Sequence, residues 1–308
     1  MKLKKPKFWD YKKPNLFALI LYPFAVILAL VSSFKKKTSE NNLKIKTICF
    51  GNIYIGGTGK TSLSLELNKL LSKKNIRSCF VKKFYKDQYD EQKLLMQNGK
   101  LFLSNKRIDA LKNAEKENYK IAILDDGLQD KSINADINII CFNNTNWIGN
   151  GMTIPSGPLR ESFENIKNYK HIFLNGNSEN IEDIKQKVLE TNPLINIYLG
   201  EYRPLNIDKF KKTQNYLVFS GIGNHRTFVS MLKNHGLKIL KDLEFPDHFQ
   251  FRKNDIDKII KQADDLNCEI ITTEKDYLRL ENLTFKKIRF IRSQIKILDE
   301  EKFLNVIL

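Results

Sequence analysis

A glycine-rich segment at residues 51–61, GNIYIGGTGKT, has the composition of a loop that binds nucleotide phosphates. Its glycines let the backbone approach a polyphosphate closely, and a helix starting at the next residue would point its N-terminus at the same charge. Lys60 would reach the β and γ phosphates, and the Thr61 hydroxyl would bind Mg²⁺. The strict pattern G-x-x-x-x-G-K-[ST] requires glycine where this chain has Tyr54, so a chance glycine-rich turn is the alternative. The residues of the predicted ATP site are Gly56, Gly57, Thr58, Gly59, Lys60 and Thr61.

Two acidic residues follow an apolar run of the kind that forms a buried strand. Residues 121–124 lead directly into Asp125 and Asp126. Carboxylates at this place in phosphate-loop proteins hold Mg²⁺ opposite the loop. We predict that Asp125 is a metal ligand and Asp126 a catalytic residue, with an ordinary turn as the alternative.

A rigid loop rich in glycine and proline, residues 149–161, ends in the charged pair Arg160 and Glu161. On its own this pattern indicates a turn with a surface salt bridge. Beside a triphosphate, Arg160 would neutralise charge on the transferred phosphoryl group, and Glu161 would help to hold the metal ion.

Among the four histidines, His248 has the context best suited to chemistry. It follows Asp247 in an otherwise apolar loop, and that loop comes after a predicted strand, where open α/β sheets bind their ligands. His225 follows a glycine turn and is a weaker candidate. We interpret His171 and His235 as structural or solvated.

The elements that position these residues can be predicted from the sequence pattern. From residue 45 onward, short apolar runs alternate with longer amphipathic runs, and this alternation predicts parallel sheets covered by helices. The polar segment 200–213 lacks periodicity, which indicates a connection between two lobes. We expect a P-loop NTPase-like parallel-sheet lobe at residues 39–205 and a smaller α/β lobe at residues 206–308 that closes the active-site cleft. The predicted strands are residues 45–50, 77–81, 121–124, 137–142, 171–174, 195–199, 216–219, 239–243, 269–272 and 288–291.

An apolar segment near the N-terminus, residues 16–31, contains no charge. Its length approaches the roughly 20 residues that a helix needs to span a bilayer. Pro23 could kink such a helix, and lysines on both sides give no orientation. We predict a basic-flanked membrane anchor at residues 1–38 that spans the bilayer or lies in its interface, with a buried helix of the soluble domain as the alternative. The flanking lysines are Lys2, Lys4, Lys5, Lys7, Lys12 and Lys13 before the segment and Lys35, Lys36 and Lys37 after it.

Composition narrows the class of protein further. The net charge is +17, but only nine of the 52 basic residues are arginine, and they are not interleaved with aromatic residues as base recognition requires. We therefore expect no nucleic-acid partner and a basic surface that faces anionic lipid. The cysteines form no C-x-x-C pair, which indicates core thiols in a reducing compartment instead of zinc ligands. They are Cys49, Cys79, Cys141 and Cys268.

The phosphate loop also resembles that of partitioning and septum-placement ATPases, K-G-G-x-G-K-T, some of which bind membranes. Their signature lysine would fall at position 55, where this chain has Ile55. Ile55 argues against this family, and a membrane-associated regulatory ATPase of this type is kept as the alternative function. Such a protein would dimerise when it binds nucleotide.

Six motifs occur along the chain in this order: GNIYIGGTGKT, DDGLQ, GNGMTIPSGPLRE, SGIGN, FPDHF and TTEKD. Together they resemble the tetraacyldisaccharide 4'-kinase family, the inner-membrane lipid A kinases of Gram-negative bacteria. The resemblance covers nearly the whole chain. It implies that the γ-phosphate of ATP is transferred, with Mg²⁺, to the 4'-hydroxyl of a tetraacyldisaccharide 1-phosphate, giving lipid IVA. It also implies that the reaction takes place at the cytoplasmic face of the bacterial inner membrane. We expect the chain to be a monomer.

The resemblance further implies roles for individual residues. Asp90, in the segment YDEQ, would be the general base that accepts the proton of the sugar hydroxyl, paired with His248. Tyr85 and Arg107 would lie on the substrate side. The other family positions are catalytic Lys60, Asp126 and Arg160 and metal-binding Thr61, Asp125 and Glu161.

Three departures from the family pattern concern the acceptor side. The family's S-R-G-Y-G is here KKFYK at residues 82–86, so only Tyr85 persists. The loop from there to Asp90 is shorter than usual, and the family's D-D-G-L-Q-H ends in Asp130. These changes bear on substrate contacts more than on reaction class, because the nucleotide and metal residues are all present.

Overall fold

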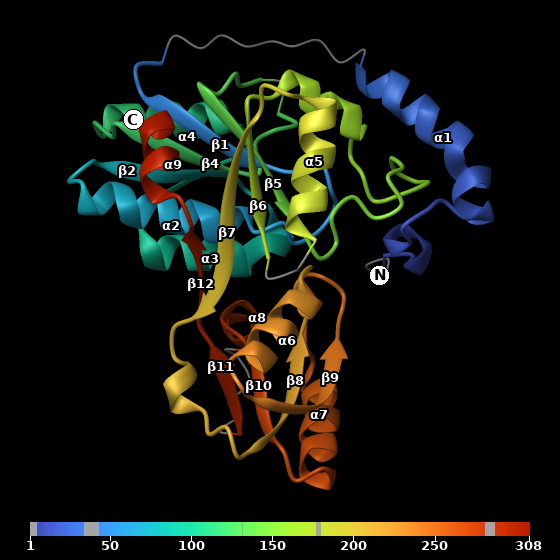
Figure 1. Ribbon diagram of the computed structural model, residues 1–308. Helices are drawn as coiled ribbons and strands as arrows, with labels where there is room; N and C mark the ends of the chain where they lie inside the picture. Colours follow the sequence, from blue (N-terminus) through green and yellow to red (C-terminus); the bar gives the residue numbers. More distant parts are fainter. Residues whose placement is uncertain (1–4, 34–42, 131, 177–179, 281–286) are drawn as a thin grey trace.

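The computed structural model describes residues 5–33, 43–130, 132–176, 180–280 and 287–308. Its strands form two separate sheets, one in each of two lobes (Figure 1). The strands of the first sheet are β1 (Lys46–Gly51), β2 (Ser78–Lys83), β3 (Leu101–Ser104), β4 (Ile121–Asp125), β5 (Ile137–Asn143), β6 (His171–Asn175), β7 (Asn196–Pro204) and β12 (Ser293–Ile297). Those of the second are β8 (Asn215–Ser220), β9 (Lys238–Glu244), β10 (Glu269–Thr273) and β11 (Ile288–Ile291).

Helices cover both sheets, as the alternating pattern predicted. The α-helices are α1 (Leu16–Ser33), α2 (Lys60–Lys73), α3 (Tyr89–Asn98), α4 (Arg107–Lys116), α5 (Ile181–Thr191), α6 (His225–Asn234), α7 (Lys253–Asp265), α8 (Glu274–Arg279) and α9 (Glu300–Ile307). Short 3-10 helices are η1 (Lys7–Asp10), η2 (Lys86–Gln88), η3 (Phe163–Asn168) and η4 (Ile207–Lys209).

The first sheet has the strand order β12-β7-β6-β5-β1-β4-β2-β3. All its neighbouring strands run parallel except β12, which is antiparallel to β7. The chain goes from β1 to β2 on one side and later returns to β5 on the other, so the strand order reverses beside β1. In open sheets of this kind, ligands bind at the carboxyl ends of the strands at that point.

The core of the first lobe explains its helix layers. The α2 leucines at 63, 67, 70 and 71 have helical spacing and are all buried against one face of the sheet. Helices α4 and α5 bury Leu111 and Val188 against the other face. Cys49, Cys79 and Cys141 are buried in strands of this sheet, as predicted, and burial raises the pKa of the Cys49 and Cys79 thiols to about 12.

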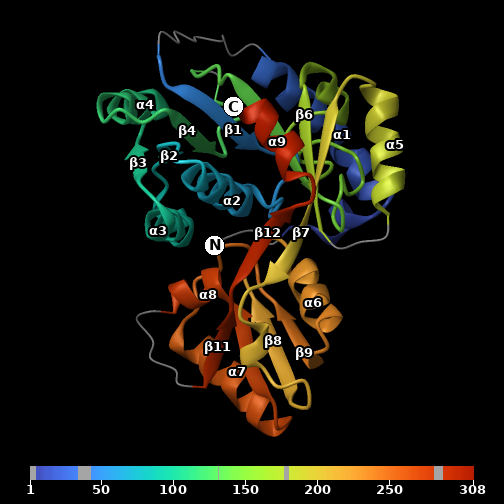
Figure 2. The same cartoon turned by 60° about the vertical axis from the view of Figure 1, so that its left-hand side comes forward.

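The second lobe repeats the same three-layer plan on a smaller sheet, ordered β11-β10-β8-β9 with parallel neighbours. Helix α6 packs on one face and α7 on the other. Figure 2 shows β7 and β12 side by side where the chain passes between the lobes. Residues 293–308 therefore return to the first lobe, so the predicted second-lobe boundary at residue 308 extends too far. The physical reason is the apolar face of α9, whose Phe303 packs edge-on against Phe173 and Tyr198.

Helix α1 lies at the side of the first lobe (Figure 1). It buries Ala18 and Ala25, and Ser156 Oγ donates a hydrogen bond to the Ala18 carbonyl at 2.9 Å. Most of its large apolar side chains are exposed, from 40% at Val26 to 71% at Leu16, so the alternative of a buried core helix is wrong. Across the described ranges, no helix has both the length and the apolar content to span a membrane. The flanking lysines at 2, 4 and 35–37 lie outside the described residues.

Candidate active site

The predicted phosphate loop lies between the end of β1 at Gly51 and the start of α2 at Lys60. Gly59, with φ 84°, has the left-handed backbone conformation that favours glycine. A side chain there would also place its Cβ 2.7 Å from Tyr202 Oη. Because Gly59 offers no side-chain cap to α2, the backbone N–H groups of its first turn stay available to an anion.

Tyr54, the residue at which the loop departs from the strict pattern, is buried against the N-terminal segment. Its hydroxyl accepts a hydrogen bond from Lys5 Nζ at 2.8 Å and donates one to Asp10 Oδ1 at 3.1 Å. Asn52 holds the following turn through a 3.2 Å bond from Nδ2 to the Gly56 carbonyl. The loop therefore keeps its shape with tyrosine at position 54.

The metal-side carboxylate lies directly beside the loop. Asp125 pairs in register with Phe50 of β1 and is fully buried. Its Oδ2 accepts hydrogen bonds from Thr61 Oγ1 at 3.3 Å and from Lys82 Nζ at 2.7 Å. The structure thus brings together the predicted metal residues Thr61 and Asp125 and adds a lysine that we did not predict.

The next residue, Asp126, has a left-handed φ of 59°, which is uncommon for aspartate. This turn directs the carboxylate to two cations, since Oδ1 is 3.6 Å from Lys60 Nζ and 3.2 Å from Arg160 Nη1. Burial alone would raise the pKa of Asp126, but Lys60 and Arg160 lower it to about 2. The three predicted catalytic residues of the nucleotide side therefore meet in one ion cluster.

Glu161, the third predicted metal ligand, has partners in its own loop. Its carboxylate accepts hydrogen bonds from Asn165 Nδ2 at 2.9 Å and from Tyr169 Oη at 3.4 Å. Its assignment to the metal stays a prediction.

The acceptor-side pair, Asp90 and His248, comes from two different lobes. Asp90 lies in the first turn of α3, and its Oδ1 is 3.2 Å from His248 Nδ1. Its Oδ2 accepts a 2.7 Å hydrogen bond from Arg279 Nη2. Burial opposes ionisation of Asp90, but the bond with His248 and the charge of Arg279 hold its pKa below the usual range. The Asp90 side chain is 1% exposed and that of His248 is 19% exposed.

Glu91, beside Asp90, joins the same region to the metal side. Its two oxygens accept hydrogen bonds of 2.9 Å from Lys82 and from Lys275. The sequence analysis assigned no role to Lys82 or Arg279, and it included Lys275 only as part of the TTEKD motif. One available signal was the spacing of Arg279, which follows Lys275 by one helical turn.

The two predicted substrate residues differ in exposure. The Tyr85 side chain is 38% exposed. Arg107 is buried, and its guanidinium donates to Asp130 Oδ2 at 2.8 Å and to the Asp126 carbonyl at 2.6 Å. Asp130, where the family has histidine, is therefore the partner of Arg107. Contacts of Tyr85 and Arg107 with substrate stay predictions.

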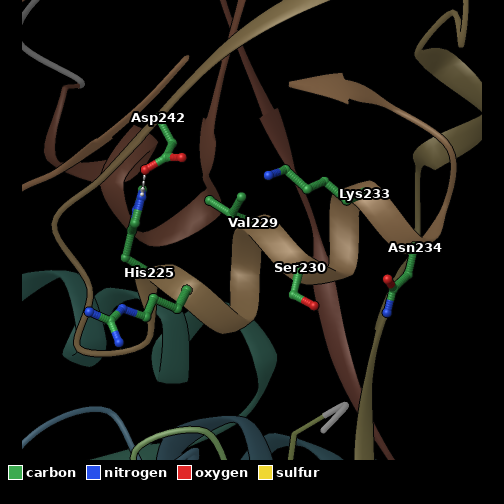
Figure 3. Close-up of a pocket in the computed structure, with 7 residues that line it drawn as sticks. His225, Val229, Ser230, Lys233, Asn234 and Asp242 are labelled. Carbon is green, nitrogen blue, oxygen red and sulfur yellow. Dashed lines mark hydrogen bonds and ion pairs between the residues drawn. The ribbon is translucent and has the colours of Figure 1, made fainter. Parts of the chain in front are cut away.

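His225 and the SGIGN motif belong to the second lobe, and the motif contacts the first lobe. His225 is buried, with Nδ1 2.7 Å from Ser220 Oγ and Nε2 3.1 Å from Asp242 Oδ1. It lines the pocket of Figure 3, which contains none of the predicted catalytic residues. The motif itself lies against the phosphate loop, because a Cβ at Gly223 would be 2.8 Å from the Gly57 Cα.

ATP and Mg²⁺ are compatible with the side chains at this site. Thr58 Oγ1 and Asp125 Oδ1 are buried and have no hydrogen-bond partner among the described residues. The described ranges contain no group of three or more His, Cys, Asp or Glu side chains placed to hold a metal ion. Kinases do not need one, because Mg²⁺ is bound by one or two carboxylates together with the substrate phosphates.

A phosphate loop between a parallel strand and a helix, in a two-lobed α/β protein that also holds a carboxylate–imidazole pair, is typical of a P-loop phosphotransferase. A model of the family described as tetraacyldisaccharide-1-P 4'-kinase matches residues 17–308. The chain belongs to the tetraacyldisaccharide 4'-kinase family. Its membership confirms the resemblance seen in the six motifs.

Individual relatives agree with this assignment. The tetraacyldisaccharide 4'-kinase of Pelagibacter ubique is 59% identical over 305 residues, which cover 99% of this chain and 97% of the relative. The protein of the same name from Rickettsia canadensis is 32% identical over 92% of this chain and 90% of its own. The crystal structure of LpxK from Aquifex aeolicus in complex with ATP has a TM-score of 0.67 at 22% identity, covering 95% of this chain and 98% of that one. This last likeness confirms the fold.

Proposed function

We propose that the chain transfers the γ-phosphoryl group of ATP to the 4'-hydroxyl of a tetraacyldisaccharide 1-phosphate, giving lipid IVA for lipid A synthesis. The observation that carries this function, in a member of this kinase family, is the Asp90–His248 pair beside Glu91, which Lys82 joins to Asp125 next to the phosphate loop. A regulatory ATPase of the partitioning type would have no use for such a pair.

On the nucleotide side, positive charge is arranged where the transferred group would develop negative charge. Lys60 begins α2 and Arg160 ends the glycine- and proline-rich loop, and Asp126 holds both cations in place. Preorganised cations of this kind stabilise a phosphoryl-transfer transition state without rearranging during the reaction. Lys60 and Arg160 therefore bind and neutralise the γ-phosphate.

Thr61 and Asp125 would hold Mg²⁺, with Glu161 as a further candidate ligand. Bound there, the ion would neutralise charge on the β and γ phosphates. The buried oxygen of Asp125 that lacks a hydrogen-bond partner among the described residues supports this role.

On the acceptor side, Asp90 and His248 act as one unit. Both Asp90 oxygens are engaged, and the imidazole is the more exposed member. The sugar hydroxyl gives its proton to this pair as its oxygen bonds to the γ-phosphorus, the bond from phosphorus to the bridging oxygen breaks, and ADP leaves. A carboxylate that orients an imidazole is a common way to raise the basicity of a base near neutral pH.

Helix α1 brings the site to its lipid substrate. Apolar side chains such as Phe17, Ile20, Phe24 and Ile27 are each more than half exposed, although water disfavours such a surface. We infer that α1 lies in the membrane interface with this surface in the lipid. We further propose that the lobes lie on the cytoplasmic side of the inner membrane. The chain would act there as a monomer, because its two lobes supply both halves of the site.

Radiolabelled phosphate transfer tests the function directly. Purified chain, γ-labelled ATP, Mg²⁺ and tetraacyldisaccharide 1-phosphate in detergent micelles should yield a labelled bisphosphorylated lipid on thin-layer chromatography. Lys60→Ala is the matched negative control, because it removes a contact to the phosphates. A wild-type chain that binds ATP but labels no lipid would exclude this substrate.

A further inference from the structure

Lys82 is a buried lysine at the centre of the site for which the proposed reaction gives no role. It lies on β2, next to the end of β4, and its side chain is 2% exposed. Burial of an ammonium group is costly unless the charge is paired. Lys82 therefore needs both of its carboxylate partners, and each of them belongs to a different half of the active site.

The partners of Lys82 form a row of alternating charges that crosses from one lobe to the other. Asp125 Oδ2 is 2.7 Å from Lys82 Nζ, which is 2.9 Å from Glu91 Oε2. Glu91 Oε1 is in turn 2.9 Å from Lys275 Nζ of the second lobe. One end of this row is the metal-side carboxylate, and the other reaches the helix α8 that also carries Arg279, the partner of Asp90.

We propose that Lys82 is a positioning residue that fixes helix α3, and with it the Asp90–His248 pair, at a set distance from the phosphate loop. Glu91 lies next to Asp90 in the first turn of α3, so the bond from Lys82 to Glu91 restrains the same turn that carries Asp90. The bond from Lys82 to Asp125 fixes the other end. This inference rests on the proposed function, because it concerns the geometry of that reaction.

The chemistry of lysine suits such a link. Glu91 and Asp125 would repel each other as two carboxylates in a buried region, and one compact ammonium with three donors can satisfy both. The family pattern has serine at this position, and a serine side chain is too short to bridge the two carboxylates. Lysine at residue 82, where the family pattern has serine, thus makes this bridge between Glu91 and Asp125 possible.

Lys82→Met and Glu91→Gln test the link singly and together. A displacement of about 1 Å in a reacting group can cost about 100-fold in rate, so Lys82→Met should lower kcat by roughly 10- to 100-fold. The Kd for ATP with Mg²⁺ should stay within about threefold of wild type, with one site per chain. Because both substitutions break the same link, kcat of the double variant should lie within about threefold of the lower single variant. Losses that multiply would overturn the proposal.

Two further measurements separate positioning from general damage. In Lys82→Met, the backbone amides of α3 should exchange with solvent several-fold faster, whereas those of α4 should not change; equal exchange in α3 would contradict the link. The matched control is Lys100→Met, which removes an exposed lysine paired with Glu117 at 3.1 Å and should leave kcat and α3 exchange unchanged.

The outcomes also distinguish this inference from the proposed function. If the wild-type chain transfers no phosphate, the function is at fault. If the wild type is active and Lys82→Met keeps its kcat, the positioning role is wrong. Should Lys82→Met fail to fold, Lys82→Gln replaces it in the same double-mutant cycle. The glutamine amide keeps a hydrogen-bond donor but removes the charge, so kcat of this variant should fall at least tenfold.

Discussion

Asp90 and His248 meet only when the two lobes are together, because one residue lies in α3 and the other in the loop after β9. Arg279 fixes the second oxygen of Asp90, so the carboxylate has little rotational freedom. A base that is assembled from two lobes cannot form while the lobes are apart. The acid–base chemistry that we propose for this pair would thereby depend on closure of the two lobes.

Substitution of either member of this pair should separate chemistry from nucleotide binding. General base catalysis contributes typically 10²- to 10⁴-fold, so Asp90→Asn or His248→Asn should lower kcat by about that factor. The Kd for ATP should stay within about threefold of wild type, since Asp90 is bonded to His248 and Arg279, which both lie outside the phosphate loop. Steady-state transfer and ATP titration measure both quantities. Asp264→Asn, in an exposed pair of the second lobe, is the control, and full activity of either site variant would refute the assigned role.

Because of the Arg107–Asp130 pair, we expect the free energy of unfolding to depend on pH. Burial would raise the pKa of Asp130, but hydrogen bonds from Ser132 and Arg107 lower it overall. A carboxylate with a lowered pKa stabilises the fold above its unfolded pKa, and this contribution is lost as the pH falls through the folded-state value. Asp130→Asn should therefore lower the free energy of unfolding at neutral pH by about 1–2 kcal/mol. The difference from wild type should shrink below about pH 4, as urea unfolding across this range would show, and a difference independent of pH would contradict it.

Some residues of the site could be predicted from the sequence and others could not. Lys60, Thr61, Asp125 and Asp126 were predictable because each follows a strand within a recognisable motif. Lys82 was not, because the sequence marks it only as a departure from the family pattern and does not reveal its partners. Its role depends on carboxylates from β4 and α3 that only the tertiary fold brings to it.

At the scale of elements, the same contrast appears among the strands of the first sheet. The ten predicted strands correspond to β1, β2 and β4 to β11, and most of these are buried on both faces and read as continuous apolar runs. Sequence reasoning missed β3 and β12, which are short and lie at the two edges of the first sheet. For β12, the antiparallel pairing with β7 supplies what its own pattern lacks.

The exposed apolar side chains of helix α1 lead to a prediction about membrane binding. Ile20 and Ile27 are two turns apart on one face and are 59% and 57% exposed, so replacing them does not disturb the core. Each buried isoleucine contributes about 1.5–3 kcal/mol, so Ile20→Asp with Ile27→Asp should weaken binding to anionic vesicles by at least about 100-fold. Vesicle cosedimentation measures this effect. Leu194→Asp, at a residue that is 89% exposed elsewhere on the first lobe, should bind as wild type does, and equal binding by both variants would argue against α1.

At the scale of the whole molecule, the chain passes between the lobes in two adjacent segments. Leu205 N donates a 2.8 Å hydrogen bond to the Arg292 carbonyl, and Arg292 N donates a 2.9 Å bond to Asn206 Oδ1. Two hydrogen-bonded segments restrict how the lobes can move relative to each other. Motion about them would open or close the space between the phosphate loop and the SGIGN loop.

Gly223 marks how closely the two loops approach, and this contact gives a test of closure. A methyl group there would lie 2.8 Å from Gly57 Cα and 3.0 Å from the Gly56 carbonyl carbon. These are backbone atoms of the phosphate loop, so they cannot move aside as a flexible side chain could. Gly223→Ala should hold the lobes apart by about 1 Å and lower kcat by roughly 100-fold.

Nucleotide binding and stability decide whether Gly223→Ala acts through closure. The thermal midpoint should stay close to that of wild type, because the added methyl group lies between the lobes and not inside either core. The Kd for ATP should rise by less than the fall in kcat, since Lys60, Thr61 and the N-terminus of α2 all belong to the first lobe. Ser230→Ala on α6 serves as the control for a change within the second lobe. A Gly223→Ala chain with wild-type kcat would mean that phosphate transfer does not require the contact between Gly57 and Gly223, and the Asp90–His248 pair would then have to form in a more open arrangement.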